Sequence, residues 1–235
     1  MDIQQRQQIL LDAKAFFKNT IAENHVKNTI KLKNPDEFNI NPFLAPYLAN
    51  FAFGDDSPES IAKALVYPRV LGTSITTSFG ANIQNFCNVV LESYASLIPG
   101  IDIEFVDAID GRRKYCQTKA GPNTINKDDV TTILNHFKDI RHLARTNRHL
   151  GINTDIDCIV GVLYGSHDAL SAFYKTIDQS HPVLCGKDFW HRLTGDESFY
   201  DALIHAFAEV AVDVDGRDTI EEVIAALAQG IAEQQ

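Results

Sequence analysis

The feature that most constrains the fold of this chain is the pair Asp110-Gly111, which separates two short segments with strand character. Residues 101–108 (IDIEFVDA) alternate apolar and polar side chains, and residues 114–119 (KYCQTK) follow the pair. An Asp-Gly pair between such segments is the strongest local signal for a β-hairpin. The sequence therefore predicts an antiparallel ribbon over residues 101–119.

A two-residue turn at the Asp-Gly pair would also fix the register of this ribbon. Asp102 would then lie opposite Lys119, and Glu104 opposite Gln117. Because side chains alternate between the two faces of a strand, these four residues would share one face, while the apolar residues of the first strand turn into the core. Two acids, an amide and a lysine would therefore gather on one side of the ribbon.

Helices are expected before, between and after the strands. They cover residues 1–30, 43–53, 81–97, 127–147, 167–178, 187–193, 198–212 and 218–233. Another helix is expected to start at Ser57-Pro58 and to end before Tyr67-Pro68, and residues 70–80 (VLGTSITTSFG) are expected to form a loop. Further strands are expected at residues 156–164 and 182–185. This order predicts an α/β fold with a mixed central β-sheet flanked by helices.

The length of the chain fits one domain over residues 1–235. Within it we expect a helical N-terminal part (1–75), a core (76–190) and acidic C-terminal helices (191–235). The net charge of −10 disfavours a nucleic-acid partner when taken alone. However, residues 110–150 hold nine basic and four acidic residues, a local charge of +5, whereas residues 196–235 carry −9. Charge acts over about a Debye length of roughly 8–10 Å, so a basic face remains possible.

The cysteine pattern and the lack of targeting motifs indicate the compartment in which we expect the protein. The four cysteines have no CxxC spacing and lie in apolar surroundings, so we expect buried, reduced thiols: Cys87, Cys116, Cys158 and Cys185. We find no signal peptide and no membrane span, and therefore expect a cytoplasmic protein with no membrane partner. No GxxxxGK[ST] loop is present, so we expect no ATP.

The polar face of the ribbon has two interpretations. Carboxylate oxygens hold Mg²⁺, and a neighbouring lysine can orient or deprotonate a water molecule, which is the equipment of phosphodiester hydrolysis. An acid and a lysine across a hairpin can equally be a surface ion pair, worth roughly 0–1 kcal/mol. The spacing of Asp102 and Lys119 alone favours the surface ion pair.

A resemblance favours catalysis instead. The run PGIDIEFVDAIDGRRKYCQTKAGPNTIN resembles the core of PD-(D/E)XK nucleases, with Pro99-Gly100-Ile101-Asp102 similar to the first half of the motif and Gln117-Thr118-Lys119 similar to the second. Two longer stretches, within residues 39–86 and at GKDFWHRLTGDESFY, are similar to bacterial type II restriction endonucleases that cut GC-rich palindromes. The resemblance covers roughly residues 28–205.

The resemblance implies roles for individual residues. Asp102 would be the main metal ligand, the carbonyl of Thr118 would complete the site, and Lys119 would serve the attacking water. Gln117 departs from the pattern, because most members have Glu or Asp there, and a neutral amide offers oxygen without charge. Glu104 is a reserve ligand. Gln84 and Glu92 lie in the preceding helix, where such nucleases often carry a supporting Glu, but a solvated helix face is the favoured interpretation.

The resemblance also implies partners. We expect a homodimer that hydrolyses double-stranded DNA at a short, GC-rich palindrome with Mg²⁺, for which Mn²⁺ can substitute, and leaves 5′-phosphates. Candidate DNA contacts, each with a structural alternative, are Ser74, Thr76, Thr77, Ser78, Arg112, Arg113, Asn123, Asn126, Arg141 and Arg145. Two alternatives stay open: a catalytically weak or inactive DNA-binding protein on a nuclease scaffold, and an enzyme acting on a small substrate.

Overall fold

The computed structural model describes residues 2–90, 94–146 and 151–234, without the side chains of residues 83, 84, 87, 88 and 234. The chain forms two compact units. Unit 1 comprises Met1–Lys14 and Ile83–Phe207, and unit 2 comprises Ala15–Asn82 and Ala208–Gln235. Both units take segments from distant parts of the sequence. The single domain and its three-part division stay a prediction.

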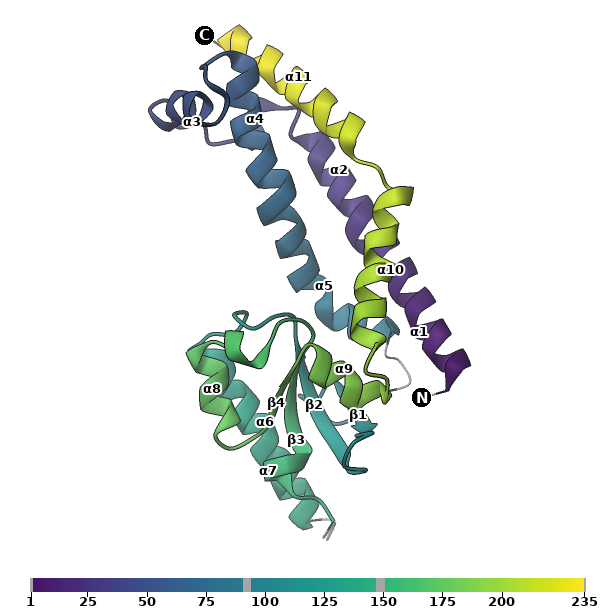
Figure 1. Cartoon of the computed structure of the whole chain (residues 1–235). Helices are drawn as coiled ribbons and strands as arrows, with labels where there is room; N and C mark the ends of the chain where they lie inside the picture. The colour runs from purple at the N-terminus through teal and green to yellow at the C-terminus, as the bar shows by residue number, and fades with distance from the viewer. Residues whose placement is uncertain (1, 91–93, 147–150, 235) are drawn as a thin grey trace. The chain divides into compact units, whose positions relative to one another are not determined.

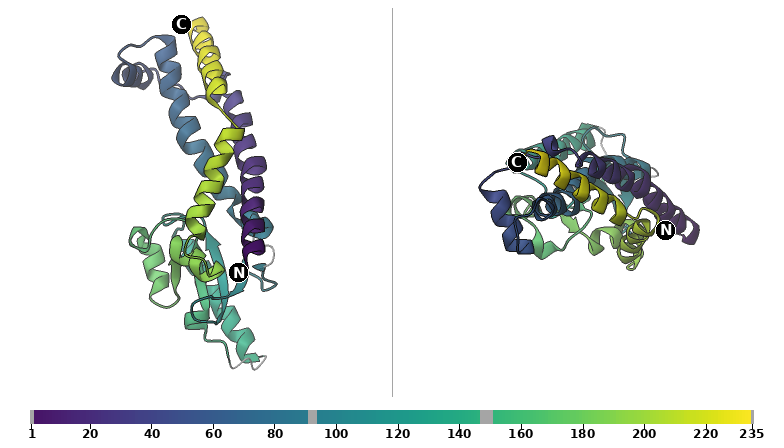
Figure 2. Two further views of the ribbon diagram at one scale, coloured as in Figure 1. Left: turned by 45° about the vertical axis from the view of Figure 1, so that its right-hand side comes forward. Right: turned by 90° about the horizontal axis from the view of Figure 1, so that it is seen from above.

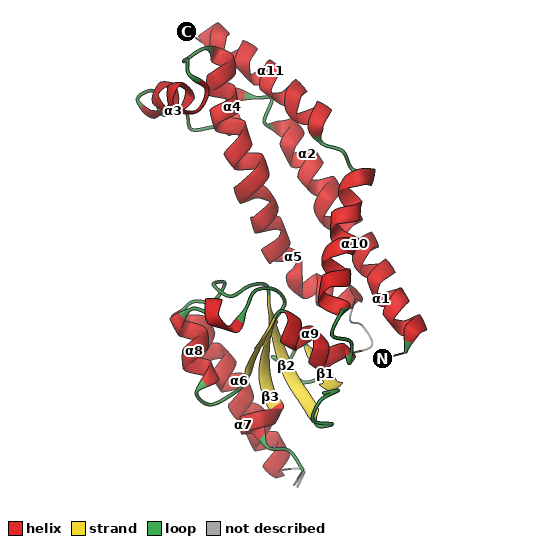
Figure 3. Ribbon diagram, in the orientation of Figure 1, coloured by secondary structure: helices red, strands yellow, loops and turns green. Residues whose placement is uncertain are grey.

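Unit 1 contains a four-stranded sheet with the order β1-β2-β3-β4 (Figures 1 and 3). The strands are β1 (Ile103–Val106), β2 (Arg113–Lys119), β3 (Cys158–Val162) and β4 (Val183–Cys185). β1 and β2 are antiparallel, whereas β2, β3 and β4 are parallel. This mixed sheet and its flanking helices confirm the predicted α/β class.

Helices cover both faces of this sheet. On one face, α6 (Lys127–Thr146) and α8 (Ala172–Asp178) bury apolar side chains against the strands, including Phe137 and Tyr174. On the other face lies α9 (Lys187–Thr194), whose Phe189 ring sits so close to Gly161 that a Cβ there would lie 2.4 Å from the ring. The short helix α7 (Thr154–Asp157) leads directly into β3.

Unit 2 is helical. Its core joins α3 (Leu44–Phe53), α4 (Pro58–Pro68) and α11 (Arg217–Gln234) with Leu32, the residue that follows α2 (Glu23–Lys31). In Figures 1 and 2, α4 and α11 run beside each other, and both contribute fully buried residues, Val66 and Leu227 among them. Three helices contribute residues to both units: α1 (Ile3–Phe16), α5 (Ile75–Val90) and α10 (Phe199–Asp213). In the part of the chain that the structure describes, no helix has the length and apolar character of a membrane span.

The predicted loop over residues 70–80 is wrong. α4 continues through Pro68 into a π-helical segment, Arg69–Ser74, and then directly into α5. Proline lacks an N–H group and clashes with the carbonyl one turn earlier, so a wider turn beside it accommodates the break without ending the helix. The start of α4 is as predicted, with the Ser57 hydroxyl accepting a hydrogen bond from the Ser60 N–H.

The hairpin forms, but its predicted register is wrong by two residues. Glu104 lies opposite Tyr115 rather than Gln117. The cause is a longer loop: the Asp107 N–H donates to the Arg112 carbonyl at 2.9 Å, so residues 108–111 form the turn. Gly111 has a φ of +69°, which favours glycine. Because a shift of two residues preserves the alternation of faces, Glu104, Gln117 and Lys119 still share one face.

Smaller corrections concern the ends of other elements. Residues 156–157 belong to α7 rather than to the strand, and β3 starts at Cys158. The predicted helix over 167–178 is divided into a 3₁₀ turn, His167–Ala169, and α8. The N-terminal helix is confirmed, as α1, a π-helical segment Phe17–Ala22, and α2. A 3₁₀ turn, Pro35–Glu37, follows it.

Candidate active site

The β1–β2 ladder ends at Ile103, and beyond it the Asp102 carboxylate, instead of a backbone carbonyl, accepts the hydrogen bond of the next N–H group on β2. Asp102 Oδ2 accepts hydrogen bonds from the Thr118 N–H at 2.6 Å and from the Thr118 hydroxyl at 3.0 Å, while the Asp102 N–H donates to the Cys116 carbonyl at 3.0 Å. In a strand the N–H and C=O of one residue point to the same side. The Thr118 carbonyl is therefore directed toward the side of β2 on which Asp102 lies.

Gln117 is buried on the adjacent face, beneath α6. Its amide nitrogen donates to the Gly100 carbonyl and lies 2.5 Å from Nδ1 of His136 on α6. The His136 ring also fills the space in which a Gly100 side chain would stand, since a Cβ there would lie 2.5 Å from it. Both hydrogen bonds of Gln117 to described residues are made by its nitrogen, so the amide oxygen is the atom oriented for another partner.

Lys119 ends β2 and shares a face with Gln117. It lies opposite Val162 of β3 in the parallel register and is only partly buried. Within residues 2–90, 94–146 and 151–234, its ammonium group makes no hydrogen bond or ion pair that the structure records. The predicted pairing of Lys119 with Asp102 across the hairpin is wrong, because the observed register brings Asp102 level with Gln117, and its carboxylate accepts from Thr118.

Glu104 has partners of its own. One carboxylate oxygen accepts from the Ser96 hydroxyl at 2.7 Å, and the other lies 3.2 Å from the Arg113 guanidinium. Glu104 and Arg113 also border a cavity of about 520 Å³ that is lined mainly by apolar side chains, including Tyr115 and Ile140. Burial, with the nearby Glu104 charge, raises the pKa of Tyr115. Binding a metal through Glu104 would require it to leave both partners.

The comparison with protein families gives a match over most of the chain. A family model of the type II restriction endonuclease EcoO109I matches residues 11–215, which is most of the 235-residue chain. The chain belongs to this family of type II restriction endonucleases. It is therefore a nuclease that cleaves DNA at specific sites. No curated protein matches the chain at a significant level.

The predicted DNA-binding arginines of this restriction endonuclease mostly have acidic partners. Arg112 Nε donates to Asp157 at 2.7 Å, Arg113 pairs with Glu104, and Arg141 pairs with Asp155. Arg145 is exposed near the end of α6, and the structure records no acidic partner for it among the described side chains.

The predicted polar contacts have mostly local roles. Asn126 caps α6: its side-chain oxygen accepts from the N–H groups of Asp128 and Asp129, at 2.8 Å and 3.1 Å. Asn123 is exposed in the preceding turn. Ser74 ends the π-helical segment, and three residues lie in the first turns of α5: Thr76, Thr77 and Ser78. They are thus on a helix rather than in a phosphate-binding loop.

A buried ionic cluster fixes the closed end of the hairpin, and the sequence interpretation missed it. Lys114 is 3 % exposed and donates to Asp110 at 2.6 Å, and the fully buried Asp107 lies 2.9 Å from Arg192 of α9. Burial by itself would raise the pKa of Asp110, but the hydrogen bonds from Lys114 and from the Arg112 N–H hold that pKa below its ordinary value. Removing one partner of such a pair would destabilise the fold, because the remaining charge would be buried without a counter-charge.

The donors at the open end of the hairpin suit a hard cation. Among the residues that the structure describes, no group of three or more His, Cys, Asp or Glu side chains could hold a metal ion. The available donors are the Asp102 carboxylate, the Gln117 amide oxygen and the Thr118 carbonyl. All are oxygens, and Mg²⁺ is commonly bound by one or two carboxylates while keeping several waters. The donor set therefore fits Mg²⁺ with few protein ligands.

Two predicted supporting residues cannot be placed. The side chain of Gln84 and the whole of Glu92 lie outside the described residues. His136, in contrast, was not predicted at all. A signal for it exists in the sequence: it lies on α6 three residues after the buried Ile133 and four before the buried Ile140, on the face that packs against the sheet.

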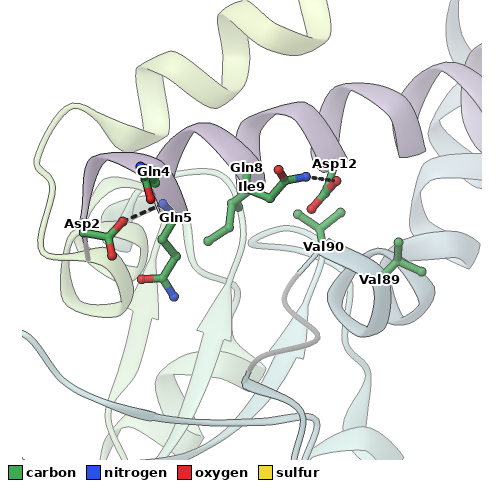
Figure 4. Close-up of a pocket in the computed structure, with 8 residues that line it drawn as sticks. All are labelled: Asp2, Gln4, Gln5, Gln8, Ile9, Asp12, Val89 and Val90. Atoms are coloured by element: carbon green, nitrogen blue, oxygen red, sulfur yellow. Dashed lines mark hydrogen bonds between the residues drawn. The ribbon is translucent and has the colours of Figure 1, made fainter.

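A second hollow of unit 1 holds none of the predicted site residues. Figure 4 shows it between α1 and the end of α5, with a volume of about 500 Å³. Its lining is mostly amide and acidic: Asp2, Gln4, Gln5, Gln8, Ile9, Asp12, Val89 and Val90. Two of these side chains are already engaged, since Asp12 accepts from Gln8 at 2.9 Å and Asp2 accepts from the Gln5 N–H at 2.7 Å.

The cysteines described are buried thiols. Cys116, Cys158 and Cys185 are buried thiols, and burial raises the pKa of Cys158 to about 12 and that of Cys185 to about 11. The thiols of Cys158 and Cys185 therefore stay protonated at neutral pH and are poor nucleophiles and metal ligands. The prediction of buried, reduced thiols is confirmed for these three.

Proposed function

We propose that this restriction endonuclease hydrolyses phosphodiester bonds of double-stranded DNA at a short, GC-rich palindrome in a Mg²⁺-dependent reaction that leaves 5′-phosphates. The observation that carries the proposal is the arrangement at the open end of the hairpin. There Thr118 holds the Asp102 carboxylate with two hydrogen bonds. Gln117 and Lys119, on either side of Thr118 in β2, share the other face of the strand. The site would thus be of the PD-(D/E)XK kind, with Gln in place of the second acid.

The metal would be held by Asp102, by the amide oxygen of Gln117 and by the Thr118 carbonyl. Mg²⁺, or Mn²⁺ in its place, supplies charge stabilisation and a bound water of lowered pKa. The two hydrogen bonds from Thr118 keep the Asp102 carboxylate in one orientation. His136 and Gly100 hold the nitrogen end of the Gln117 amide, which would leave its oxygen end for the metal.

Lys119 would act on the attacking water. Its ammonium group can donate hydrogen bonds that orient the water, and its positive charge offsets the negative charge that develops on the phosphate. The partly buried position at the end of a strand fixes the lysine stem by its backbone pairing to β3. The absence of a competing acidic partner among the described side chains leaves the ammonium group available for this role.

The DNA partner implies two copies of the chain. A palindrome has two-fold symmetry, so two identical subunits can each read a half-site and cut one strand. We propose that phosphate contacts come from Arg145, Asn123 and the polar first turns of α5 more than from the three arginines engaged with acids. Arg112, Arg113 and Arg141 would need to leave their carboxylates first.

A second candidate is a catalytically weak DNA-binding protein on the same scaffold. Gln117 favours it, because the site has one carboxylate where a second is usual, and Glu104 is held by Ser96 and Arg113. A low affinity for Mg²⁺ would follow from this missing charge.

Incubation of phage or plasmid DNA with the purified protein and Mg²⁺ distinguishes the two candidates. We expect discrete fragments whose ends carry 5′-phosphate and whose sequences define one palindrome, and no fragments in the presence of EDTA. Retarded but intact DNA at all Mg²⁺ and Mn²⁺ concentrations would favour the binding protein. Cleavage that persists in EDTA would contradict the metal dependence.

Substitutions at Gln117 test its role as a ligand. Gln117→Ala should raise the Mg²⁺ concentration for half-maximal cleavage by roughly ten-fold or more, the usual effect of losing a group that supports a metal site. Gln117→Glu restores a carboxylate, and the Nδ1–H tautomer of a neutral His136 can donate a hydrogen bond to it. We therefore expect Gln117→Glu to gain metal affinity.

Binding of Ca²⁺ or Mn²⁺, measured by calorimetry without DNA, gives a readout independent of cleavage. Gln229→Ala, which alters an exposed glutamine on α11, serves as the control and should leave metal binding unchanged. If both Gln117 substitutions leave metal binding and cleavage unchanged, Gln117 is not a ligand and Glu104 becomes the alternative.

A further inference from the structure

The helix α3 exposes a group of large apolar side chains to solvent. The large side chains of the helix and its first flanking residue point to solvent: Phe43, Leu44, Tyr47, Leu48, Phe51 and Phe53. Phe43 is 87 % exposed, Tyr47 62 % and Phe51 79 %. The Tyr47 and Phe51 rings are stacked, with their centroids 6.1 Å apart. We call these six residues the α3 surface.

The packing of α3 is inverted relative to an ordinary surface helix. Its buried positions, Ala45 and Ala49, are small and pack into the core of unit 2 with α4 and α11. Its exposed positions from Leu44 to Phe51 follow the three- and four-residue spacing of a single helix face. An amphipathic helix normally buries the larger apolar side chains, so this helix presents its main apolar face outward.

The area of the α3 surface is comparable to one side of a protein interface. With roughly 150–250 Å² for an aromatic side chain, the exposed fractions leave on the order of 600–700 Å² of apolar surface. The largest apolar patch on a monomer is usually ~300–600 Å², and a standard interface buries about 800 Å² on each partner. Two α3 surfaces facing each other would therefore nearly make up a standard interface.

We propose that the α3 surface binds the α3 surface of a second copy of this chain and is the main apolar contact of the dimer. The inference deepens the proposed homodimer and rests on it. A two-fold axis brings the same patch of both copies together, so a single helix face suffices when it is self-complementary. The Tyr47–Phe51 pair would lie at the centre of this contact.

The charge of the segment favours a second copy over other partners. Residues 41–56 contain no Lys or Arg, and their only charged residues are Asp55 and Asp56. DNA and anionic lipid surfaces are held by basic side chains, which this segment lacks. Each copy carries a net charge of −10, so self-association needs a contact free of like charges, and the six residues of the α3 surface meet that need.

The experiment measures the oligomeric state of the full chain by sedimentation, without DNA or metal. The natural protein should be dimeric at micromolar concentration. Phe51→Glu places a negative charge from each copy in the contact. It should raise the dissociation constant of the dimer by about 30-fold or more, the effect expected of an interface hot spot. Phe51→Ser, which removes apolar area without adding charge, should also raise the dissociation constant of the dimer.

Val212→Glu is the matched control, because Val212 is an 84 % exposed apolar residue on α10, outside the α3 surface. It should leave the dimer intact, and all three variants should keep the circular dichroism of the natural protein. A monomeric natural protein, a Phe51→Glu dimer of unchanged affinity, or equal weakening by Val212→Glu would each overturn the proposal. Cleavage is assayed separately: a dimer disrupted by Phe51→Glu in a protein that never cuts DNA would refute the proposed function and leave the α3 contact standing.

Discussion

Asp102→Ala should reduce DNA cleavage by roughly 10³-fold or more, the scale seen when a group that stabilises developing charge is removed. Asp102 supplies the carboxylate of the proposed metal site, where its Oδ2 accepts two hydrogen bonds from Thr118. Without it the proposed metal site has neutral donors only. Most of the affinity for the target DNA, measured without a metal ion, should remain, because basic side chains rather than Asp102 hold the phosphates.

Asp102→Asn separates the charge from the local structure. An amide oxygen can still accept from the Thr118 N–H, so this variant should fold as the natural protein does and be nearly as inactive as Asp102→Ala. Asp102→Ala leaves that N–H without its acceptor, which costs about 1–3 kcal/mol, and should lower the melting temperature. Asp139→Ala, an exposed acid on α6, is the control for cleavage. Cleavage by Asp102→Asn within ten-fold of the natural rate would sink the assignment of Asp102.

Lys119→Ala should reduce the single-turnover rate of cleavage by roughly 10²–10⁴-fold, the range for loss of a group that moves or positions a proton. Lys119→Met keeps the length of the side chain and removes only its charge, so it should be about as slow. Both variants should bind target DNA within a few-fold of the natural affinity. Since the Lys119 ammonium group has no partner among the described residues, the free energy of unfolding should change by no more than about 0.5 kcal/mol.

Lys138→Ala is the matched control for Lys119, because Lys138 is an exposed lysine of the α6 helix with no role in the proposed chemistry. A Lys119→Met protein that loses DNA affinity in proportion to its cleavage rate would identify Lys119 as a phosphate contact. A Lys119→Met protein that cuts at the natural rate would show that another group acts on the water.

The hairpin illustrates how far local sequence signals reach. Asp110-Gly111 correctly located the turn, and alternation correctly assigned Glu104, Gln117 and Lys119 to one face. The register was wrong because it depends on the length of the loop. That length is decided by the buried cluster around Lys114, Asp107 and Arg192, in which α9 takes part. A contact with a helix some 80 residues away cannot be read from the turn itself.

The helix through residues 67–80 illustrates the opposite error. Pro68, Gly72 and a run of Ser and Thr all favour a loop locally. The chain stays helical because Val66 and Val70 on either side of Pro68 are buried in unit 2 and the π-helical segment absorbs the missing hydrogen bond. Tertiary packing here outweighs a propensity cost of about 3 kcal/mol for a proline in a helix.

The sequence by itself determined the α/β class, the order of most elements, the turn and the face that carries the acid, amide and lysine. These follow from periodicity and turn chemistry, which act between residues close in the chain. Only the tertiary structure decided that Asp102 bonds Thr118 rather than facing Lys119, that His136 holds Gln117, and that α3 turns its aromatic face to solvent. Each of these is set by the packing of segments distant in sequence, where a shift of a few ångströms selects one partner over another.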